Sequence, residues 1–144
     1  MRINDVLRGK SSQDVVTIRP DANVRDLIAL LAEHNVGALI VSTDGDSVEG
    51  IVSERDVVRS LHADEAMLDG PVSAIMTATV QSCEGTALVT ELMQVMTDHR
   101  IRHVPVLTEG RLTGIISIGD VVKHRIGELE FERDQLDHYV HQTK

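Results

Sequence analysis

Aromatic residues and cysteine are scarce in this sequence of 144 residues. It has no tryptophan, one phenylalanine and one tyrosine, and both aromatic residues, Phe131 and Tyr139, fall near the C-terminal end. A packed core elsewhere must therefore be built from Val, Ile, Leu, Ala and Met side chains. The single cysteine, Cys83, excludes an internal disulfide and favours a reducing compartment.

Basic residues and long apolar runs are also few. The formal net charge is −9, so the chain lacks the basic surface that nonspecific binding to nucleic acid or an anionic membrane needs. Charged residues interrupt each apolar stretch before it could span a bilayer, and residues 1–5 are too polar for a secretory leader. We therefore expect a cytoplasmic protein that partners neither nucleic acid nor membrane.

A duplication organises the rest of the chain. When residues 15–58 are moved about 65 positions along the sequence, fourteen residues recur unchanged, among them His34 as His99 and Gly45 as Gly110. A chain of this length can form a core without a metal or a disulfide. Each half alone would be small for that, so we expect the two repeats to share one core.

Each repeat is predicted to fold as strand, helix, strand, strand, helix. In the first repeat, the β-branched run 15–18 predicts a strand, and apolar residues at helical spacing predict a helix over residues 24–34. An Asp-Gly turn separates the apolar runs 38–41 and 50–52, which predicts a hairpin. Ser53 then begins a second helix as its N-cap.

The second repeat copies this order. Pro105 falls within one of its strands, which favours an edge strand or a position whose N–H no neighbour needs. The predicted elements are a strand at 79–80, a helix over 86–99, a strand pair at 104–106 and 112–116, and a helix that opens at Ser117.

A lead-in segment precedes each repeat. Gly70 and Pro71 mark a break in the linker 62–78, and residues 72–77 resemble the N-terminal segment 3–7. We therefore predict three parts: residues 1–64 as the first repeat with its lead-in, 65–126 as the second repeat with a lead-in from about residue 71, and 127–144 as a helical tail.

The tail carries an apolar stripe on a helix whose other faces are largely charged. Its members alternate at spacings of four and three, as in a short heptad pattern. The helix can pack back on its own domain or contribute to a homodimer, and the flanking Phe131 and Tyr139 favour the homodimer. The stripe, which Arg133 interrupts, consists of Val122, Ile126, Leu129, Arg133, Leu136 and Val140.

A serine followed three residues later by an aspartate comes after a glycine-led apolar strand in both repeats, as Ser53 with Asp56 and Ser117 with Asp120. A single pair of this kind is ordinarily a helix cap. At a helix N-terminus, however, the hydroxyl and free N–H groups can also meet a phosphate, and the carboxylate can accept both hydrogen bonds from a ribose 2′,3′-diol. Two copies at matching positions favour ligand clefts over capping alone.

These ordered repeats resemble the cystathionine-β-synthase (CBS) domain family in its tandem form, the Bateman module. The resemblance covers about residues 3–126 and leaves only the tail outside. It implies an α/β fold in which two β-α-β-β-α repeats pack through their sheets with pseudo-twofold symmetry. The segments that carry it are 38–41, 50–58, 75–77, 101–106 and 114–122.

The resemblance also implies two clefts that bind adenosine-containing ligands: AMP, ADP, ATP, NAD or S-adenosylmethionine. Asp56 and Asp120 would each hold a ribose, with Ser53 and Ser117 near the ribose or phosphate. Residues at the strand entries and in the apolar strands would enclose the base and read its edge through backbone groups. They are Thr17, Ile18, Ser82 and Cys83 at the entries, and Gly37, Ala38, Leu39, His103, Val104 and Pro105 in the strands.

Phosphate would be met near the pseudo-axis by Arg55, Arg102 and His103, although each of these can equally be a solvated surface group. The matching positions of the other repeat are glycine or alanine. The two clefts are therefore expected to differ in affinity.

Catalytic motifs are not found in the sequence: there is no nucleophile elbow, no Gly-Lys-Ser phosphate loop and no H-E-x-x-H zinc motif. His34 and His99 are expected at helix ends, His138 and His141 lack further metal ligands, and Cys83 suits a small buried hydrophobe. We therefore predict a regulatory module, not an enzyme, that binds an adenine nucleotide and acts as a homodimer on an unidentified protein. The alternative is a ligand-independent interaction scaffold that uses the C-terminal helix.

Overall fold

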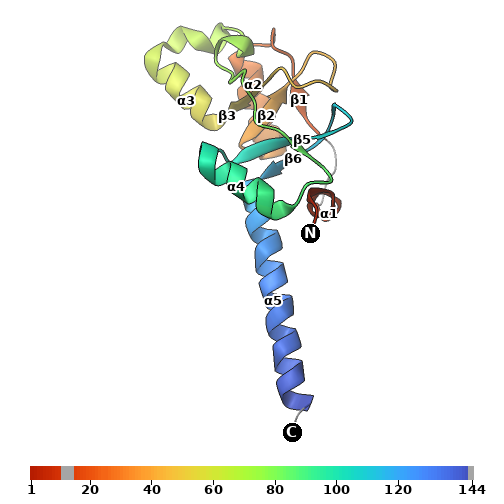
Figure 1. Ribbon diagram of the computed structural model, residues 1–144. Coiled ribbons are helices and arrows are strands. Elements are labelled where there is room, and N and C mark those ends of the chain that lie inside the picture. The colour runs from red at the N-terminus through yellow and green to blue at the C-terminus, as the bar shows by residue number, and fades with distance from the viewer. Residues whose placement is uncertain (11–14, 143–144) are drawn as a thin grey trace.

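The computed structural model describes residues 1–10 and 15–142. The main body holds two small sheets with their helices, and a long C-terminal helix projects from it (Figure 1). The helices are α1 (Ile3–Arg8), α2 (Val24–His34), α3 (Glu54–Ala63), α4 (Val89–His99) and α5 (Ile118–Gln142), with short 3-10 turns η1 (Glu65–Asp69) and η2 (Val72–Ala74). The strands are β1 (Thr17–Ile18), β2 (Ala38–Val41), β3 (Gly50–Ser53), β4 (Cys83–Glu84), β5 (His103–Thr108) and β6 (Arg111–Ser117).

The two sheets repeat one topology. In the first, β2 pairs in parallel with β1 and antiparallel with β3, and in the second, β5 pairs in the same way with β4 and β6. The register repeats as well, because Ile18 lies opposite Val41 and Cys83 lies opposite Val106. The predicted α/β class with two strand-helix-strand-strand-helix units and a C-terminal helix is confirmed.

Left-handed residues end the same elements in both halves. Asn35 at φ 51° and Arg100 at φ 54° terminate α2 and α4, so that His34 and His99 lie in the last helical turns as predicted. Each hairpin between the paired strands has a glycine at φ near +80°, a conformation that costs glycine no steric strain. Local sequence thus fixes where these helices and hairpins end.

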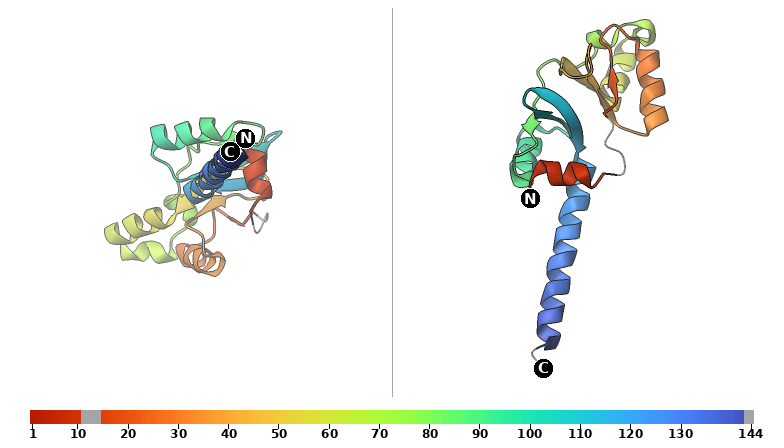
Figure 2. Two further views of the ribbon diagram at one scale, coloured as in Figure 1. Left: turned by 90° about the horizontal axis from the view of Figure 1, so that it is seen from below. Right: turned by 90° about the vertical axis from the view of Figure 1, so that its right-hand side faces the viewer.

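The lead-in segments are exchanged between the repeats. The N–H of Ile3 donates to the carbonyl of Ala87 at 3.0 Å, and the N–H of Val72 donates to the carbonyl of Ala22 at 2.8 Å. Ile3 is fully buried in the second half and Val72 in the first. Figure 2 shows α1 beside the start of α5 and away from α2. Each repeat is therefore completed in space by the segment that precedes the other along the chain.

Most buried apolar residues form two hydrophobic clusters, one in each half, instead of the single shared core that we expected, and the buried Ala38, Ile40 and Leu112 belong to neither cluster. The exchanged lead-ins supply apolar residues to each cluster. Each half of this short chain can therefore bury a cluster of its own. The first cluster contains Ile18, Val24, Leu27, Leu31, Leu39, Val41, Val52, Val57 and Val72, and the second contains Ile3, Val6, Val89, Leu92, Met96, Val104, Val106, Ile116 and Val121.

One predicted strand of the second repeat is wrong, and the place of Pro105 is explained by the sheet. Thr79 and Val80 lie outside any strand, because the strand that pairs with β5 begins only at Cys83. Pro105 lies in the central strand β5 and not on an edge, so the second predicted alternative, a position whose N–H no neighbour needs, is the one found. The ladder from β4 reaches β5 only from Val106 onward, so Pro105 lies beyond it and needs no N–H there.

The C-terminal tail is not a separate element but the continuation of α5. Val121 anchors the start of this helix in the second cluster, and the stripe residues beyond it are exposed, at 51% for Ile126 and 65% for Leu136. The alternative in which the tail packs back on its own domain is therefore wrong. Across residues 1–10 and 15–142, no helix is long and apolar enough to cross a membrane.

Candidate functional site

A cavity of about 260 Å³ lies where the two repeats meet. Strands β2 and β3 and the start of α3 form one side, and the linker before β4 and the turn between α4 and β5 form the other. We call it the Asp56 cleft. Its lining comprises Gly37, Ala38, Ile51, Ser53, Glu54, Arg55, Asp56, Thr77, Thr79, Val80, Gln81, Arg100, Ile101, Arg102 and His103.

The predicted Ser-Asp pair lies at the junction of β3 and α3 in this cleft. The N–H and hydroxyl of Ser53 donate to Oδ2 of Asp56 at 2.9 and 3.1 Å, and the N–H of Asp56 donates back to the serine hydroxyl at 3.3 Å. The pair therefore forms a helix capping box. Because a carboxylate has two oxygens and about four acceptor positions, the half-buried Asp56 keeps capacity for a ligand diol.

Three exposed arginines and one histidine add positive charge to the cleft. Arg55 comes from the first turn of α3, whereas Arg100 and Arg102 lie in the turn between α4 and β5. The ring of His103 lies beside Gly37, where an added Cβ would be 3.4 Å from its Cε1 atom. The cleft therefore combines the carboxylates of Asp56 and Glu54 with cations suited to an anionic ligand.

Burial lowers the pKa of His103. The carboxylates of Asp120 and Glu54 oppose this shift, and the positive charges of Arg102 and Lys10 add to it. His103 is therefore biased toward the neutral imidazole, which can both donate and accept a hydrogen bond in the cleft.

The second Ser-Asp pair has a different partner. The N–H of Ser117 donates to Oδ2 of Asp120 at 2.9 Å, as in the first repeat, but the ammonium of Lys10 also lies 3.0 Å from the same oxygen. Burial raises the pKa of Asp120, yet the hydrogen bonds from Ser117 and Lys10 and the charge of Lys10 outweigh it and hold the pKa below its usual value. Asp120 is therefore an ionised carboxylate in an ion pair.

The structure gathers some of the predicted site residues in the Asp56 cleft and leaves others elsewhere. Ile18, Leu39 and Val104 are buried in the two clusters, so only their backbone groups could meet a ligand. The residues that it brings to the cleft are Gly37, Ala38, Ser53, Arg55, Asp56, Arg102 and His103, and those outside the lining are Thr17, Ile18, Leu39, Ser82, Cys83, Val104, Pro105, Ser117 and Asp120.

Cys83 packs against the second cluster and its thiol lies 3.7 Å from the carbonyl of Pro105. Burial raises the pKa of this thiol to about 11, with a smaller contribution from Glu84. A thiol with so high a pKa is a poor nucleophile near neutral pH, which agrees with the predicted role as a small apolar side chain.

Part of the lining of the Asp56 cleft is not among the residues predicted from the sequence. Arg100 follows the aligned His99 and occupies the left-handed position that ends α4, so the match with Asn35 could have placed it at the turn beside β5. Thr79 and Val80 line the cleft in place of the strand that the sequence predicts for them. The other residues missed are Ile51, Glu54, Thr77, Gln81 and Ile101.

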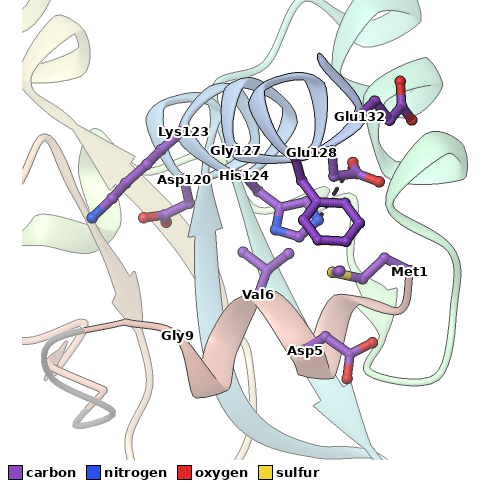
Figure 3. Close-up of a pocket in the computed structure, with 11 residues that line it drawn as sticks. Met1, Asp5, Val6, Gly9, Asp120, Lys123, His124, Gly127, Glu128 and Glu132 are labelled. Atoms are coloured by element: carbon purple, nitrogen blue, oxygen red, sulfur yellow. Dashed lines mark ion pairs between the residues drawn. The ribbon is translucent and has the colours of Figure 1, made fainter. Parts of the chain in front are cut away.

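A second cavity, of about 630 Å³, lies between α1 and α5, and the predicted site residue Asp120 is part of its lining. Figure 3 shows Val6 on α1 facing His124 and Glu128 on α5, with Met1 at one side. His124 Nε2 lies 3.5 Å from Glu128 Oε1, too far for a normal hydrogen bond. In the described part of the chain, no group of three or more His, Cys, Asp or Glu side chains is placed to hold a metal ion.

Known proteins match both repeats. The family model described as CBS domain matches residues 3–63 and again residues 72–127. The CBS domain-containing protein CBSX3, mitochondrial, of Arabidopsis thaliana is 35% identical over 146 residues, which span 96% of this chain and 71% of that protein. The crystal structure of a CBS-domain containing protein from Agrobacterium tumefaciens is 41% identical, with a TM-score of 0.81 over 87% of this chain and 99% of that one.

A more distant structure shares the same fold. The CBS domain pair of protein MJ0100, in complex with 5′-methylthioadenosine and S-adenosyl-L-methionine, has a TM-score of 0.78 and 21% identity over 89% of this chain and 98% of that one. The matches cover both repeats together with their lead-ins. This chain therefore belongs to the CBS domain family and carries two tandem copies of the domain.

Proposed function

We propose that this protein is a regulatory module, without catalysis of its own, that binds a phosphorylated adenine nucleotide in the Asp56 cleft. The observation that carries the proposal is the convergence of both repeats on one cavity that holds Asp56 together with three arginines. Its volume of about 260 Å³ is near the lower end of small-molecule pockets, roughly 300–1,000 Å³. A mononucleotide suits this size.

The chemistry of the lining supports a ribose and a phosphate. Asp56 offers carboxylate oxygens to a vicinal diol, a stronger acceptor than a neutral group because it is charged. Arg55, Arg100 and Arg102 offer planar donor groups whose geometry matches phosphate oxygens. AMP, ADP, ATP and NAD present both features, whereas an uncharged nucleoside presents only the diol.

The complex of protein MJ0100 with two adenosine-bearing ligands supports the choice of adenine compounds for testing. Neither of those ligands carries a phosphate. The arginines of the Asp56 cleft therefore lead us to rank phosphorylated ligands above S-adenosylmethionine for this chain.

Thermal unfolding of the purified chain tests the proposal. It should be measured with AMP, ADP, ATP, NAD and S-adenosylmethionine, and with GTP as a non-adenine control. A native-state ligand at about 100 times its dissociation constant adds about 2.7 kcal/mol of stability, which raises the melting temperature by several degrees. The shift should vanish in an Asp56→Ala variant that remains folded. Equal shifts in the variant, or none with any adenine ligand, would contradict the proposal.

The same proposal includes a homodimer that passes the signal to a protein partner. The exposed stripe on α5 supports it, because side chains at alternating spacings of four and three form one seam along a helix. Burying each Leu, Ile or Val of the stripe against a second copy would contribute about 1.5–3 kcal/mol. Ligand can alter such a dimer only through a difference in affinity between two of its states.

A second candidate function is a ligand-independent interaction scaffold that uses α5. The exposed apolar residues of this helix favour it, since they present a surface even when the cleft is empty. The two functions differ in one measurement. A nucleotide that binds through Asp56 supports the sensor, whereas partner binding that ignores every nucleotide and requires only α5 supports the scaffold.

A further inference from the structure

Lys10 reaches from the N-terminal segment into the second repeat. Its ammonium donates to Oδ2 of Asp120 at 3.0 Å and to the carbonyl of Ile115 at 2.9 Å. The side chains of Lys10 and Asp120 are only 28% and 23% exposed, so the ion pair is largely shielded from water. A charged hydrogen bond in such a place is stronger than an exposed one.

The fold holds Lys10 there through α1. This helix is anchored by the buried Ile3 and Val6, and the N–H of Lys10 itself donates to the carbonyl of Leu7 at 3.2 Å. Leu7 in turn packs on the second cluster. The exchanged lead-in therefore holds the Lys10 ammonium in place, unlike the ammonium of a free surface side chain.

The first repeat has a different residue at the corresponding place. A Cβ added to Gly114 would meet Leu7, and one added to Gly50 would meet Met76, so Leu7 and Met76 occupy equivalent positions in the two lead-ins. Counted from these two residues, the equivalent of Lys10 is Thr79, which lines the Asp56 cleft. An uncharged threonine cannot form an ion pair with the carboxylate of that cleft.

The location of the Lys10 ammonium shows whether it would meet the phosphate or the sugar of a nucleotide. In a nucleotide the 2′,3′-diol and the 5′-phosphate lie at opposite ends of the ribose. A cation that met phosphate would therefore lie away from the carboxylate that holds the diol. Lys10 instead lies on the carboxylate of Asp120 and on the carbonyl of Ile115, at the end of β6 just before α5.

We infer that Lys10 is an internal cation that fills the sugar position beside Asp120, so that the protein takes a single nucleotide, in the Asp56 cleft. This inference rests on the proposed nucleotide binding and restricts it to one of the two Ser-Asp pairs. A ligand diol at Asp120 must compete with the Lys10 ammonium, which occupies an acceptor position of Oδ2 and neutralises the carboxylate. Lys10 therefore sets the number of ligands per chain and adds to the difference between the two repeats.

Calorimetric titration of the full chain with AMP, ADP and ATP tests the inference. The wild type should bind one nucleotide per chain and lose it on Asp56→Ala. Lys10→Met should open a second site with at least about a tenfold gain in affinity, because a charged hydrogen bond of about 1.5 kcal/mol no longer competes. That second site should disappear when Asp120→Ala is added. Lys10→Arg, which keeps the charge, should behave as the wild type.

Lys123→Met is the matched control, because it removes one positive charge from α5 near Asp120 and leaves the Lys10 ion pair in place. Two sites in the wild type, one of them lost with Asp120→Ala, would overturn the inference. The inference would also be overturned if Lys10→Met gained no second site, or if Lys123→Met gained the same second site at Asp120.

The proposed function and the inference fail in different variants. If the wild type binds no nucleotide but Lys10→Met binds one through Asp120, the Asp56 cleft is not the site and the role of Lys10 stands. If the wild type binds one nucleotide through Asp56 and Lys10→Met adds none, the proposed function stands and the role of Lys10 is wrong. If neither protein binds, both are wrong.

Discussion

The N–H of Ser53 donates to Oδ2 of Asp56 at 2.9 Å, so one carboxylate both caps α3 and faces the cleft. These two roles are not alternatives, because the cap leaves other acceptor positions of the carboxylate for a ligand. The geometry of the cap instead orients the carboxylate before any ligand arrives. A preordered acceptor costs less conformational entropy on binding than a mobile one.

A conservative variant separates the two roles. Asp56→Asn keeps an amide oxygen that can accept from Ser53, so the free energy of unfolding should fall by about 1 kcal/mol or less. Nucleotide affinity should fall about 10- to 100-fold, because a charged acceptor is lost. Calorimetric titration and urea unfolding measure the two effects. Asp69→Asn, on an exposed carboxylate paired with Arg25, is the control and should change affinity little. Unchanged affinity in Asp56→Asn would contradict a ribose-binding role.

The arginines of the Asp56 cleft should distinguish nucleotides from nucleosides. Arg100→Gln and Arg102→Gln each remove a donor that the proposal directs at phosphate, so each should weaken AMP about tenfold and adenosine hardly at all. Competitive titration with AMP and adenosine gives the ratio directly. Arg19→Gln, at an exposed ion pair with Asp21, serves as the charge control. Equal losses for both ligands would mean that these arginines act on the fold or the base instead.

The parts of this structure that sequence predicts are those that local chemistry decides. Helix ends at His34 and His99, hairpin glycines and the Ser53 cap depend on a few neighbouring residues, and all are found as expected. The duplication strengthens these predictions, because a pattern that occurs in both repeats is less often a coincidence. Asp56 reaches the cleft for the same reason, since the cap fixes its orientation.

The parts that sequence does not predict depend on contacts between distant segments. Nothing local to Lys10 indicates that it lies against Asp120, because the contact requires the lead-in to cross to the other repeat. Thr79 and Arg100 meet in one cleft for a similar reason, since each lies in a turn whose position the paired sheets determine. The short strand β4 begins at Cys83 because β5 offers partners only there.

Acid should destabilise the protein partly through His103. Its pKa is lowered in the folded state, mainly by burial, whereas an unfolded histidine titrates near 6.5. The unfolded chain therefore takes up the proton first, and the free energy of unfolding falls as pH drops below about 6.5 until the folded pKa is passed. His103→Gln should show a smaller fall between about pH 7 and pH 5 in urea unfolding. A fall as steep as in the wild type would show that His103 is not responsible.

Gly50 should tolerate no side chain. A Cβ there would lie 3.0 Å from the carbonyl oxygen of Thr77 and would also meet the side chain of Met76. Gly50→Ala should therefore lower the free energy of unfolding by about 1–3 kcal/mol, as overpacking does. Gly127→Ala is the control, since its Cβ would meet open space on α5 and should stabilise the helix by up to about 1 kcal/mol. Equal effects of the two variants in urea unfolding would contradict this packing.

Dimerisation through α5 should depend on its stripe. Leu129 is half-exposed and lies in the middle of the seam formed by the stripe residues. Leu129→Glu would bring two like charges into an apolar seam, so sedimentation equilibrium should show a dimer for the wild type and a monomer for the variant. Gln135→Glu adds the same charge on α5 outside the stripe and should leave the dimer intact. A dimer that survives Leu129→Glu would place the interface elsewhere, and a wild-type monomer would leave the stripe to a different protein, as the scaffold function requires.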